Sequence, residues 1–362
     1  MATKQLNLRA SASSRWIACP ASAKLSAQMP YVESGDAAKI GTAIHKLAEE
    51  CFINDGDPMW YVGKVFEGIT MTEENCEFAL EHLKAIWKIE DELGEGSVQV
   101  EQFIPYQDTQ VCKVGGTTDV IGISKEKRKL IIADLKTGRG YVDADNEQLK
   151  LYALSALNKD NLFRDISTVE LWIIQPHHGE TRKHSMTIQE LVDWEHYILM
   201  PAIENALNPA YPPTPSDSAC QYCPAKTICP AQQQIVEVVA SAPPIAVLTE
   251  QQISVLLAQF DMVEDYIKAV RDHALKRMES GAVIDGWQLT PKRALRSWTK
   301  ESDVVPALLS LGLTIDQIVK QELITPAAAE KLLPKDLKQS IEPLTSRISS
   351  GLTLARDKGL TQ

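Results

Sequence analysis

Two stretches of this sequence decide its fold: GGTTDVIG at residues 115–122 and LIIADLKTG at residues 130–138. Both are rich in Val, Ile and Leu, which is typical of strands. The charged run KEKR at residues 125–128 separates them and predicts a solvated hairpin turn. Each predicted strand delivers one carboxylate, Asp119 on the first and Asp134 on the second.

The pattern Asp-Leu-Lys at the end of the second stretch suggests a chemical role. Successive side chains of a strand alternate between its faces, so Asp134 and Lys136 project to one side while Leu135 points into the core. If Asp119 lies near Asp134, the two carboxylates can share a hard cation such as Mg²⁺ or Mn²⁺. Such a cation polarises a phosphoryl oxygen and acidifies a bound water, which the lysine would orient. The alternative is a surface hairpin with exposed acids.

Two predicted helices carry further candidates. Apolar residues at helical spacing indicate an amphipathic helix with His45 at the edge of its apolar stripe. This His45 is either a packed, hydrogen-bonded residue or a metal ligand. A second helix is predicted to begin near Ala144 and to place Gln148 and Tyr152 four residues apart, hence on one face. There they could contact a phosphate or orient the lysine.

In this order and spacing, the patterns G-x-x-x-H, G-x-x-D, D-x-K-T-G and Q-x-x-x-Y resemble the RecB-like branch of the PD-(D/E)XK nucleases, over roughly residues 35–175. The resemblance implies an α/β fold with a mixed central sheet flanked by helices. It also implies a Mg²⁺- or Mn²⁺-dependent cleavage site. The residues that match are the metal ligands His45, Asp119 and Asp134, the catalytic lysine Lys136, and the supporting residues Gln148 and Tyr152.

Glu101 is a weaker candidate for the same site. It lies in VQVEQF at residues 98–103, a predicted strand that precedes the first aspartate. Many RecB-like relatives carry a glutamate at this point, so the resemblance implies a catalytic or metal-binding role. An ion pair with a nearby Lys or Arg is the alternative.

Cysteine usage provides an independent argument. The chain has seven cysteines, and neither a secretory signal nor an apolar run of about 18 residues. We therefore expect a cytoplasmic protein without disulfides and without contact to a membrane. Three cysteines form the pattern C-x₂-C-x₅-C in a loop punctuated by prolines, and another precedes the predicted core. These four residues are Cys19, Cys220, Cys223 and Cys229.

One cysteine before the core and three after it resemble the arrangement in iron–sulfur nucleases. These include the AddB subunit of bacterial helicase–nucleases and the related CRISPR-associated exonucleases. The resemblance implies a [4Fe–4S] cluster that clamps the two ends of the domain together, so that folding depends on the metal. Zinc in a tetrahedral Cys₄ site is the alternative, because the ligands alone do not separate the two.

At 362 residues and 40.1 kDa, the chain can hold one large or two modest domains. The segment SAPP at residues 241–244 marks a boundary. We expect a nuclease domain over residues 1–240, including the cysteines, and a mostly helical region over residues 245–362. A long helix capped by Thr249 and reaching about Met278 opens the second region.

The formal net charge of −11 is unusual for a nucleic-acid enzyme, but local charge matters more than the total. Residues 268–300 carry an excess of Lys and Arg over Asp and Glu. Within this stretch Lys292, Arg293 and Arg296 are candidates for contacts with DNA phosphates. The alternative is a solvated helix face followed by a charged strand.

Together these features predict a metal-dependent DNA exonuclease. The opening segment LRASASSRW at residues 8–16 and the other motifs also resemble phage- and prophage-encoded nucleases. That resemblance implies processing of phage DNA ends in recombination or replication, in the host cytoplasm and beside a single-strand annealing protein. Three alternatives remain: an endonuclease or trimming nuclease, a non-catalytic DNA-binding accessory subunit, and a Cys₄ zinc adaptor for protein partners.

Overall fold

The structure is a computed structural model, and the residues that it describes are 5–30, 35–159, 161–244, 247–290, 306 and 309–310. The chain divides into two compact units between Gln288 and Leu289, and nearly all described residues belong to the first. Lys292, Arg293 and Arg296 lie outside the described residues. Within the described part, no helix is both long enough and apolar enough to cross a membrane.

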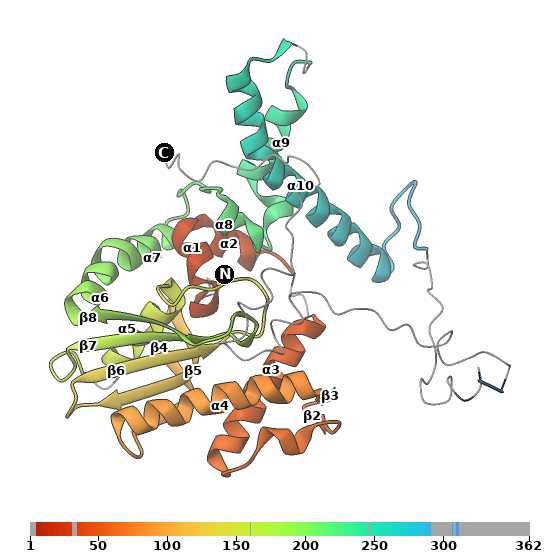
Figure 1. The fold of residues 1–362 in the computed structure, drawn as a ribbon. Helices are drawn as coiled ribbons and strands as arrows, with labels where there is room; N and C mark the ends of the chain where they lie inside the picture. The colour runs from red at the N-terminus through yellow and green to blue at the C-terminus, as the bar shows by residue number, and fades with distance from the viewer. Residues whose placement is uncertain are drawn as a thin grey trace, which may run out of the picture. The chain divides into compact units, whose positions relative to one another are not determined.

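A six-stranded mixed sheet forms the centre of the first unit (Figure 1). Strand β5 pairs with β4 along one edge and, along the other, first with β1 and then with β6. The sheet continues through β7 to β8, and the pairs β1–β5 and β6–β7 are parallel. Its strands are β1 (Leu6–Arg9), β4 (Val98–Asp108), β5 (Cys112–Ser124), β6 (Lys129–Leu135), β7 (Thr168–Ile174) and β8 (Arg182–Thr187).

Helices cover both faces of this sheet (Figure 1). Helix α5 packs on one face, and α4, with α3 against it, packs on the other. A small hairpin of β2 (Val65–Phe66) and β3 (Ile69–Thr70) lies between α3 and α4 in the sequence. The helices are α1 (Ser13–Ala18), α2 (Ala21–Ala27), α3 (Asp36–Ile53), α4 (Glu73–Leu93), α5 (Glu147–Lys159), α6 (Ile188–Trp194), α7 (Met200–Leu207), α8 (Asp217–Gln221), α9 (Pro230–Ala240) and α10 (Glu250–Glu279).

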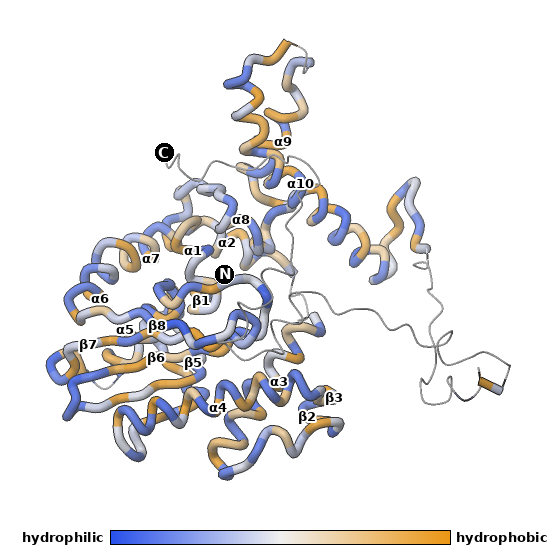
Figure 2. The backbone as a smooth tube through the Cα atoms, in the orientation of Figure 1, coloured by the Kyte–Doolittle hydropathy of each residue, from blue (hydrophilic) through white to orange (hydrophobic). Residues whose placement is uncertain are grey.

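Strand alternation divides the hydrophobic core into two layers. In β6, Leu130 and Ile132 pack in the layer beneath α5, whereas Ile131 and Leu135 pack in the layer beneath α3 and α4. Hydrophobic and hydrophilic residues accordingly alternate along α4 in Figure 2, as expected of a helix with one face on a sheet. Asp134 lies two residues after Ile132 and therefore on the same face of β6, directed towards α5.

The mixed central sheet with flanking helices confirms the α/β part of the predicted fold class. The hairpin strands occur where they were expected, with the intervening turn at residues 125–128 exposed. The helix with Gln148 and Tyr152 begins at Glu147, three residues after the predicted start. The predicted iron–sulfur cluster that joins the two ends of the domain stays a prediction.

Helix α10 begins as predicted, because Thr249 forms a capping box with Gln252. The helix contacts α8 and α9, and Asp265 pairs with Lys226 at 2.6 Å. It belongs to the first compact unit, and the predicted boundary at residues 241–244 stays a prediction. The helical character of the region beyond it lies largely outside the described residues, so that part of the domain prediction stays a prediction.

The close packing of α4 on β5 depends on Gly122. A Cβ atom there would lie 2.5 Å from Ile89 Cγ2 and 2.7 Å from Leu93 Cδ1, too close for either helix residue to remain in place. We expect Gly122→Ala to lower the free energy of unfolding by about 1–3 kcal/mol through overpacking, measured by urea denaturation. Gly140→Ala is the matched control, because nothing lies within 4 Å of a Cβ there. Equal stability of the two variants would contradict this packing.

Candidate functional site

Three carboxylates share one register across three neighbouring strands. Val120 of β5 pairs with Val100 of β4 on one side and with Ala133 of β6 on the other. One position further along, the same register aligns Glu101 of β4, Asp119 of β5 and Asp134 of β6. Asp119 and Asp134 are only 8% and 3% exposed, so the surface-hairpin alternative is excluded.

This line of carboxylates lies at a notch in the sheet. Strand β1 pairs with β5 only as far as Gly115, and β6 begins to pair only at Val120. Between these points no described strand covers that edge of β5. A cavity of about 570 Å³ opens here, and Asp119, Asp134 and Lys136 line it.

Gly115 permits the strand geometry beside this cavity. Its φ is +138°, and a Cβ atom would lie 2.6 Å from the carbonyl oxygen of Ile104. Opposite it, the β4–β5 register shifts between Pro105 and Gln107. A side chain at this glycine would therefore clash with the backbone of β4 as well as strain its own backbone.

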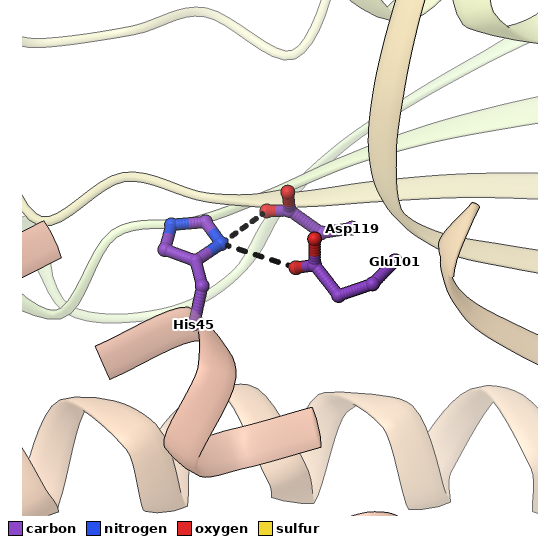
Figure 3. A group of neighbouring side chains, drawn as sticks. All are labelled: His45, Glu101 and Asp119. Atoms are coloured by element: carbon purple, nitrogen blue, oxygen red, sulfur yellow. Dashed lines mark ion pairs between the residues drawn. The ribbon is translucent and has the colours of Figure 1, made fainter. Parts of the chain in front are cut away.

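Helix α3 directs His45 at two of the carboxylates (Figure 3). Its Nδ1 lies 3.2 Å from Asp119 Oδ2 and 3.7 Å from Glu101 Oε1. Burial lowers the pKa of His45, but the carboxylates, chiefly Asp119, raise it to about 10 overall. Among the described residues, Glu101 finds its ion-pair partner in this histidine rather than in a Lys or Arg.

A second group of contacts connects Asp134 to α5. Lys136 Nζ lies 2.7 Å from Asp134 Oδ2 and donates to Gln148 Oε1 at 2.9 Å. The amide nitrogen of Gln148 donates in turn to Asp134 Oδ1 at 2.9 Å and to Tyr152 Oη at 3.4 Å. Gln148 thus bonds to both Asp134 and Lys136 and fixes the position of one relative to the other. The predicted helix face with Gln148 and Tyr152 therefore does meet the Asp-Leu-Lys strand.

The charges of the site shift the pKa values of its members. Burial, followed by repulsion from Asp134, raises the pKa of Asp119, although His45 and the amide of Leu135 oppose that shift. Burial lowers the pKa of Lys136, but attraction by Asp134 raises it overall, so the lysine is cationic. The site therefore concentrates negative charge on its carboxylates. The protonated side chains of His45 and Lys136 offset that charge when no metal cation is bound.

The donor set fits a hard divalent cation. Ligand atoms of His45, Glu101 and Asp119 all lie within 4.8 Å of one another. Carboxylate oxygens with one imidazole nitrogen suit Mn²⁺, and the oxygens suit Mg²⁺. Burial of the aspartates favours a bound cation further, because unpaired charge is costly in a poorly solvated site.

The cavity also contains residues that the sequence did not single out. Arg9 occurred only within the quoted opening segment, and Phe103 and Lys113 carried no motif signal. His82 of α4 does not line the cavity, but its buried ring lies 5.8 Å from that of His45, and burial followed by repulsion from His45 lowers the pKa of His82 to about 3. No local pattern assigned a role to these individual residues, so only the packing of distant segments reveals their proximity to the site.

A second cluster assembles from the cysteines. The four predicted residues line one small pocket together with Lys226 and Gln232, and all seven cysteines are free thiols. Cys19 follows α1, whereas the other three lie in and around α8 and the start of α9. The pocket therefore connects segments that are about 200 residues apart in the chain.

Hydrogen bonds reach two of these sulfur atoms. The backbone amide of Thr214 donates to Cys19 Sγ at 3.3 Å, and Gln232 Nε2 donates to Cys220 Sγ at 3.2 Å. Such donors stabilise thiolate ligands. Burial raises the pKa of the Cys220 and Cys223 thiols, so these groups bind a metal only with loss of their protons.

A family model described as "Protein of unknown function (DUF2800)" matches residues 6–359. The chain belongs to the DUF2800 family. It is also similar to the "Putative exonuclease" of Eubacterium rectale, with a TM-score of 0.35 and 11% identity over 66% of this chain and 94% of that chain. Similarity to SSO0001 is lower, with a TM-score of 0.26 and 14% identity over 59% of this chain and 95% of that chain. Likeness of this strength establishes no function for the DUF2800 chain.

Glu101 adopts a left-handed backbone conformation, with φ at +49°, inside a strand. This conformation costs a residue with a Cβ about 1–2 kcal/mol relative to glycine. We therefore expect Glu101→Gly to be more stable than Glu101→Ala by about 1 kcal/mol in metal-free protein, as measured by denaturant unfolding. Both variants lack the carboxylate, so their difference isolates the backbone.

Gln99 of the same strand provides the control. It has no positive φ, and there glycine should be less stable than alanine by about 0.5–1 kcal/mol. The same sign of the Gly–Ala difference at both positions would contradict backbone strain at Glu101.

Proposed function

We propose that this chain is a metal-dependent nuclease that hydrolyses DNA phosphodiester bonds, acting as an exonuclease. The observation that carries the proposal is the alignment of three carboxylates on β4, β5 and β6, with His45 and Lys136 directed at them in one cavity. The exonuclease assignment comes from the resemblance of the ordered motifs to RecB-like nucleases.

The residues that would hold the cation are His45, Glu101, Asp119 and Asp134. Bound there, Mg²⁺ or Mn²⁺ supplies Lewis-acid polarisation of the phosphate and a water of lowered pKa. The buried Asp119 and Asp134 lie at the notch between β1 and β6, where the proposal puts that chemistry.

Lys136 is the side chain placed to act on the reacting groups. It is cationic beside Asp134 and lies at the wall of the cavity, so it can orient the attacking water or neutralise charge on the phosphate. Gln148 holds Lys136 and Asp134 through one amide group, and Tyr152 supports that amide. These two residues position the lysine rather than react.

The cysteine pocket supports a second part of the proposal, a [4Fe–4S] cluster on Cys19, Cys220, Cys223 and Cys229. The four cysteines come from both ends of the nuclease domain, and the preference for iron over zinc comes from the resemblance to iron–sulfur nucleases. In this proposal the cluster has a structural role.

Processing of phage DNA ends beside a single-strand annealing protein remains a proposal based on motif resemblance. DNA contacts by Lys292, Arg293 and Arg296 are likewise a proposal from the sequence, since these residues lie outside the described part of the chain.

We expect Asp119→Ala and Asp134→Ala to abolish digestion of end-labelled linear DNA in Mg²⁺ or Mn²⁺, because each removes a cation ligand. Lys136→Ala should lower the cleavage rate by about 10²–10⁴-fold yet retain Mn²⁺ binding. Cleavage is measured by gel electrophoresis and Mn²⁺ binding by calorimetry. A closed circular substrate, which has no ends, distinguishes exonuclease from endonuclease activity.

Lys125→Ala is the control for this series, because Lys125 is exposed on the hairpin turn and pairs with Asp165 at 3.0 Å, outside the cavity. It should cleave as wild type does. Near wild-type cleavage by either aspartate variant would refute the nuclease assignment. DNA binding without cleavage by the wild type in both metals would support the accessory-subunit alternative instead.

The cluster proposal predicts brown protein after anaerobic purification, with absorption near about 400 nm from thiolate-to-iron charge transfer. Cys19→Ser should lose this colour as completely as Cys223→Ser does. Cys51→Ser and Cys76→Ser are matched controls, because both residues are buried but lie outside the pocket. Colourless protein that contains zinc would rule out iron, and full colour in Cys19→Ser would remove that residue from the site.

A further inference from the structure

The catalytic cavity continues past the carboxylates towards the start of β5 and the neighbouring strand β1. Lys113, near the start of β5, lines the same cavity as Asp119 further along that strand. The two residues are six positions apart, at most about 20 Å along a strand that rises 3.3–3.4 Å per residue. Asn7 of β1 pairs with Lys113, and Arg9 follows on the same face of β1. All four residues line the one cavity.

This far end of the cavity is basic, in contrast to the acidic centre. Arg9 is exposed, and among the described residues no carboxylate pairs with its guanidinium. Lys113 pairs with Asp108 at 3.4 Å, an exposed ion pair of the kind that contributes little. The two cations are thus available to an anion that enters the cavity.

Phe103 is an exposed aromatic residue between the two ends. It pairs with Thr117 in the β4–β5 ladder, two residues from Asp119, and 51% of its surface is exposed at the cavity wall. Lys113 Nζ lies 4.5 Å from the centroid of the Phe103 ring. A ring that can stack on a base and a cation that can pair with a phosphate are therefore immediate neighbours.

We propose that the segment formed by Arg9, Phe103 and Lys113 is a binding subsite for single-stranded DNA, in which a base stacks on Phe103 and the flanking phosphates pair with the two cations. The proposal rests on the proposed nuclease function and specifies its substrate. The strand then passes from the basic end of the cavity to the carboxylates, where the scissile phosphate lies.

The stacking ring is what distinguishes a single strand from a duplex. In a duplex the faces of each base are covered by its neighbours, so an aromatic side chain can stack only on an unpaired or terminal base. Phosphate contacts from Arg9 and Lys113 alone would serve either form. Phe103 would therefore contribute affinity for a single strand and little for a continuous duplex.

The test is equilibrium binding of a fluorescein-labelled oligothymidylate, measured by anisotropy with Ca²⁺ in place of Mg²⁺, with electrophoresis to verify that the strand stays intact. Phe103→Leu, which keeps an apolar side chain, should weaken binding roughly 5- to 150-fold, the effect of losing one stacked base. Phe103→Trp should restore it. Neither change should alter the affinity for a closed circular duplex by more than about twofold.

The cations are tested by salt dependence. Arg9→Ala and Lys113→Ala should each reduce the log–log slope of affinity against salt by about 0.7, the value for one phosphate contact on a single strand. The matched controls are Lys125→Ala and Trp60→Ala, since Lys125 is an exposed, ion-paired lysine and Trp60 is 64% exposed, both outside the cavity. Both should bind as wild type does.

Unchanged single-strand affinity in Phe103→Leu, or an equal loss for single strand and duplex, would overturn the subsite. If the wild type cleaves DNA while Phe103→Leu binds normally, the subsite is wrong and the nuclease stands. If the wild type binds single strands through Phe103 but cleaves no DNA, the proposed nuclease function is wrong and the proposed binding subsite stands.

Discussion

The candidate site depends on one constraint, the common register of β4, β5 and β6, which brings Glu101, Asp119 and Asp134 into line. Three carboxylates in line repel one another, and partial burial strengthens that repulsion because water screens it less. Packing on both faces of the sheet supplies the compensation. Helix α3 contributes His45, and α5 holds Lys136 through Gln148. A slip of one residue in the β4–β5 or the β5–β6 pairing would turn Glu101 or Asp134 to the opposite face and separate the three carboxylates.

The same strands create the opening beside the carboxylates. Because β1 leaves β5 before β6 joins it, part of the β5 edge remains accessible, and Gly115 lets the backbone approach β4 there. The left-handed conformation of Glu101 lies in the same region. Backbone strain of this kind is typical of functional sites, where the surrounding structure holds a residue in a costly conformation. The notch and the strained residue thus have one origin, the departure of this region from a regular sheet.

The cysteine pocket bears on the same region through the N-terminal segment. Cys19 follows α1, and within α1 the indole of Trp16 donates to the carbonyl of Arg9 at 2.9 Å. In the proposed holoprotein, a cluster that fixes Cys19 to the later cysteines would also fix α1, and with it the β1 residue at the basic end of the cavity. Loss of that cluster would then affect the basic end of the cavity more directly than the carboxylates, which belong to the central strands.

The sequence by itself determined the elements that local periodicity encodes, namely the β5–β6 hairpin, the helices with His45 and Gln148, and the helix that Thr249 caps. It also indicated the side chains that gather at the carboxylates and the four cysteines that share a pocket. Only the tertiary structure decided the alignment of Glu101 with the aspartates, its left-handed backbone, and the approach of Arg9, Phe103 and Lys113. The physical reason is that strand register depends on how whole strands pair, and that β1 pairs with a strand about 100 residues later in the chain, which no local pattern of residues contains.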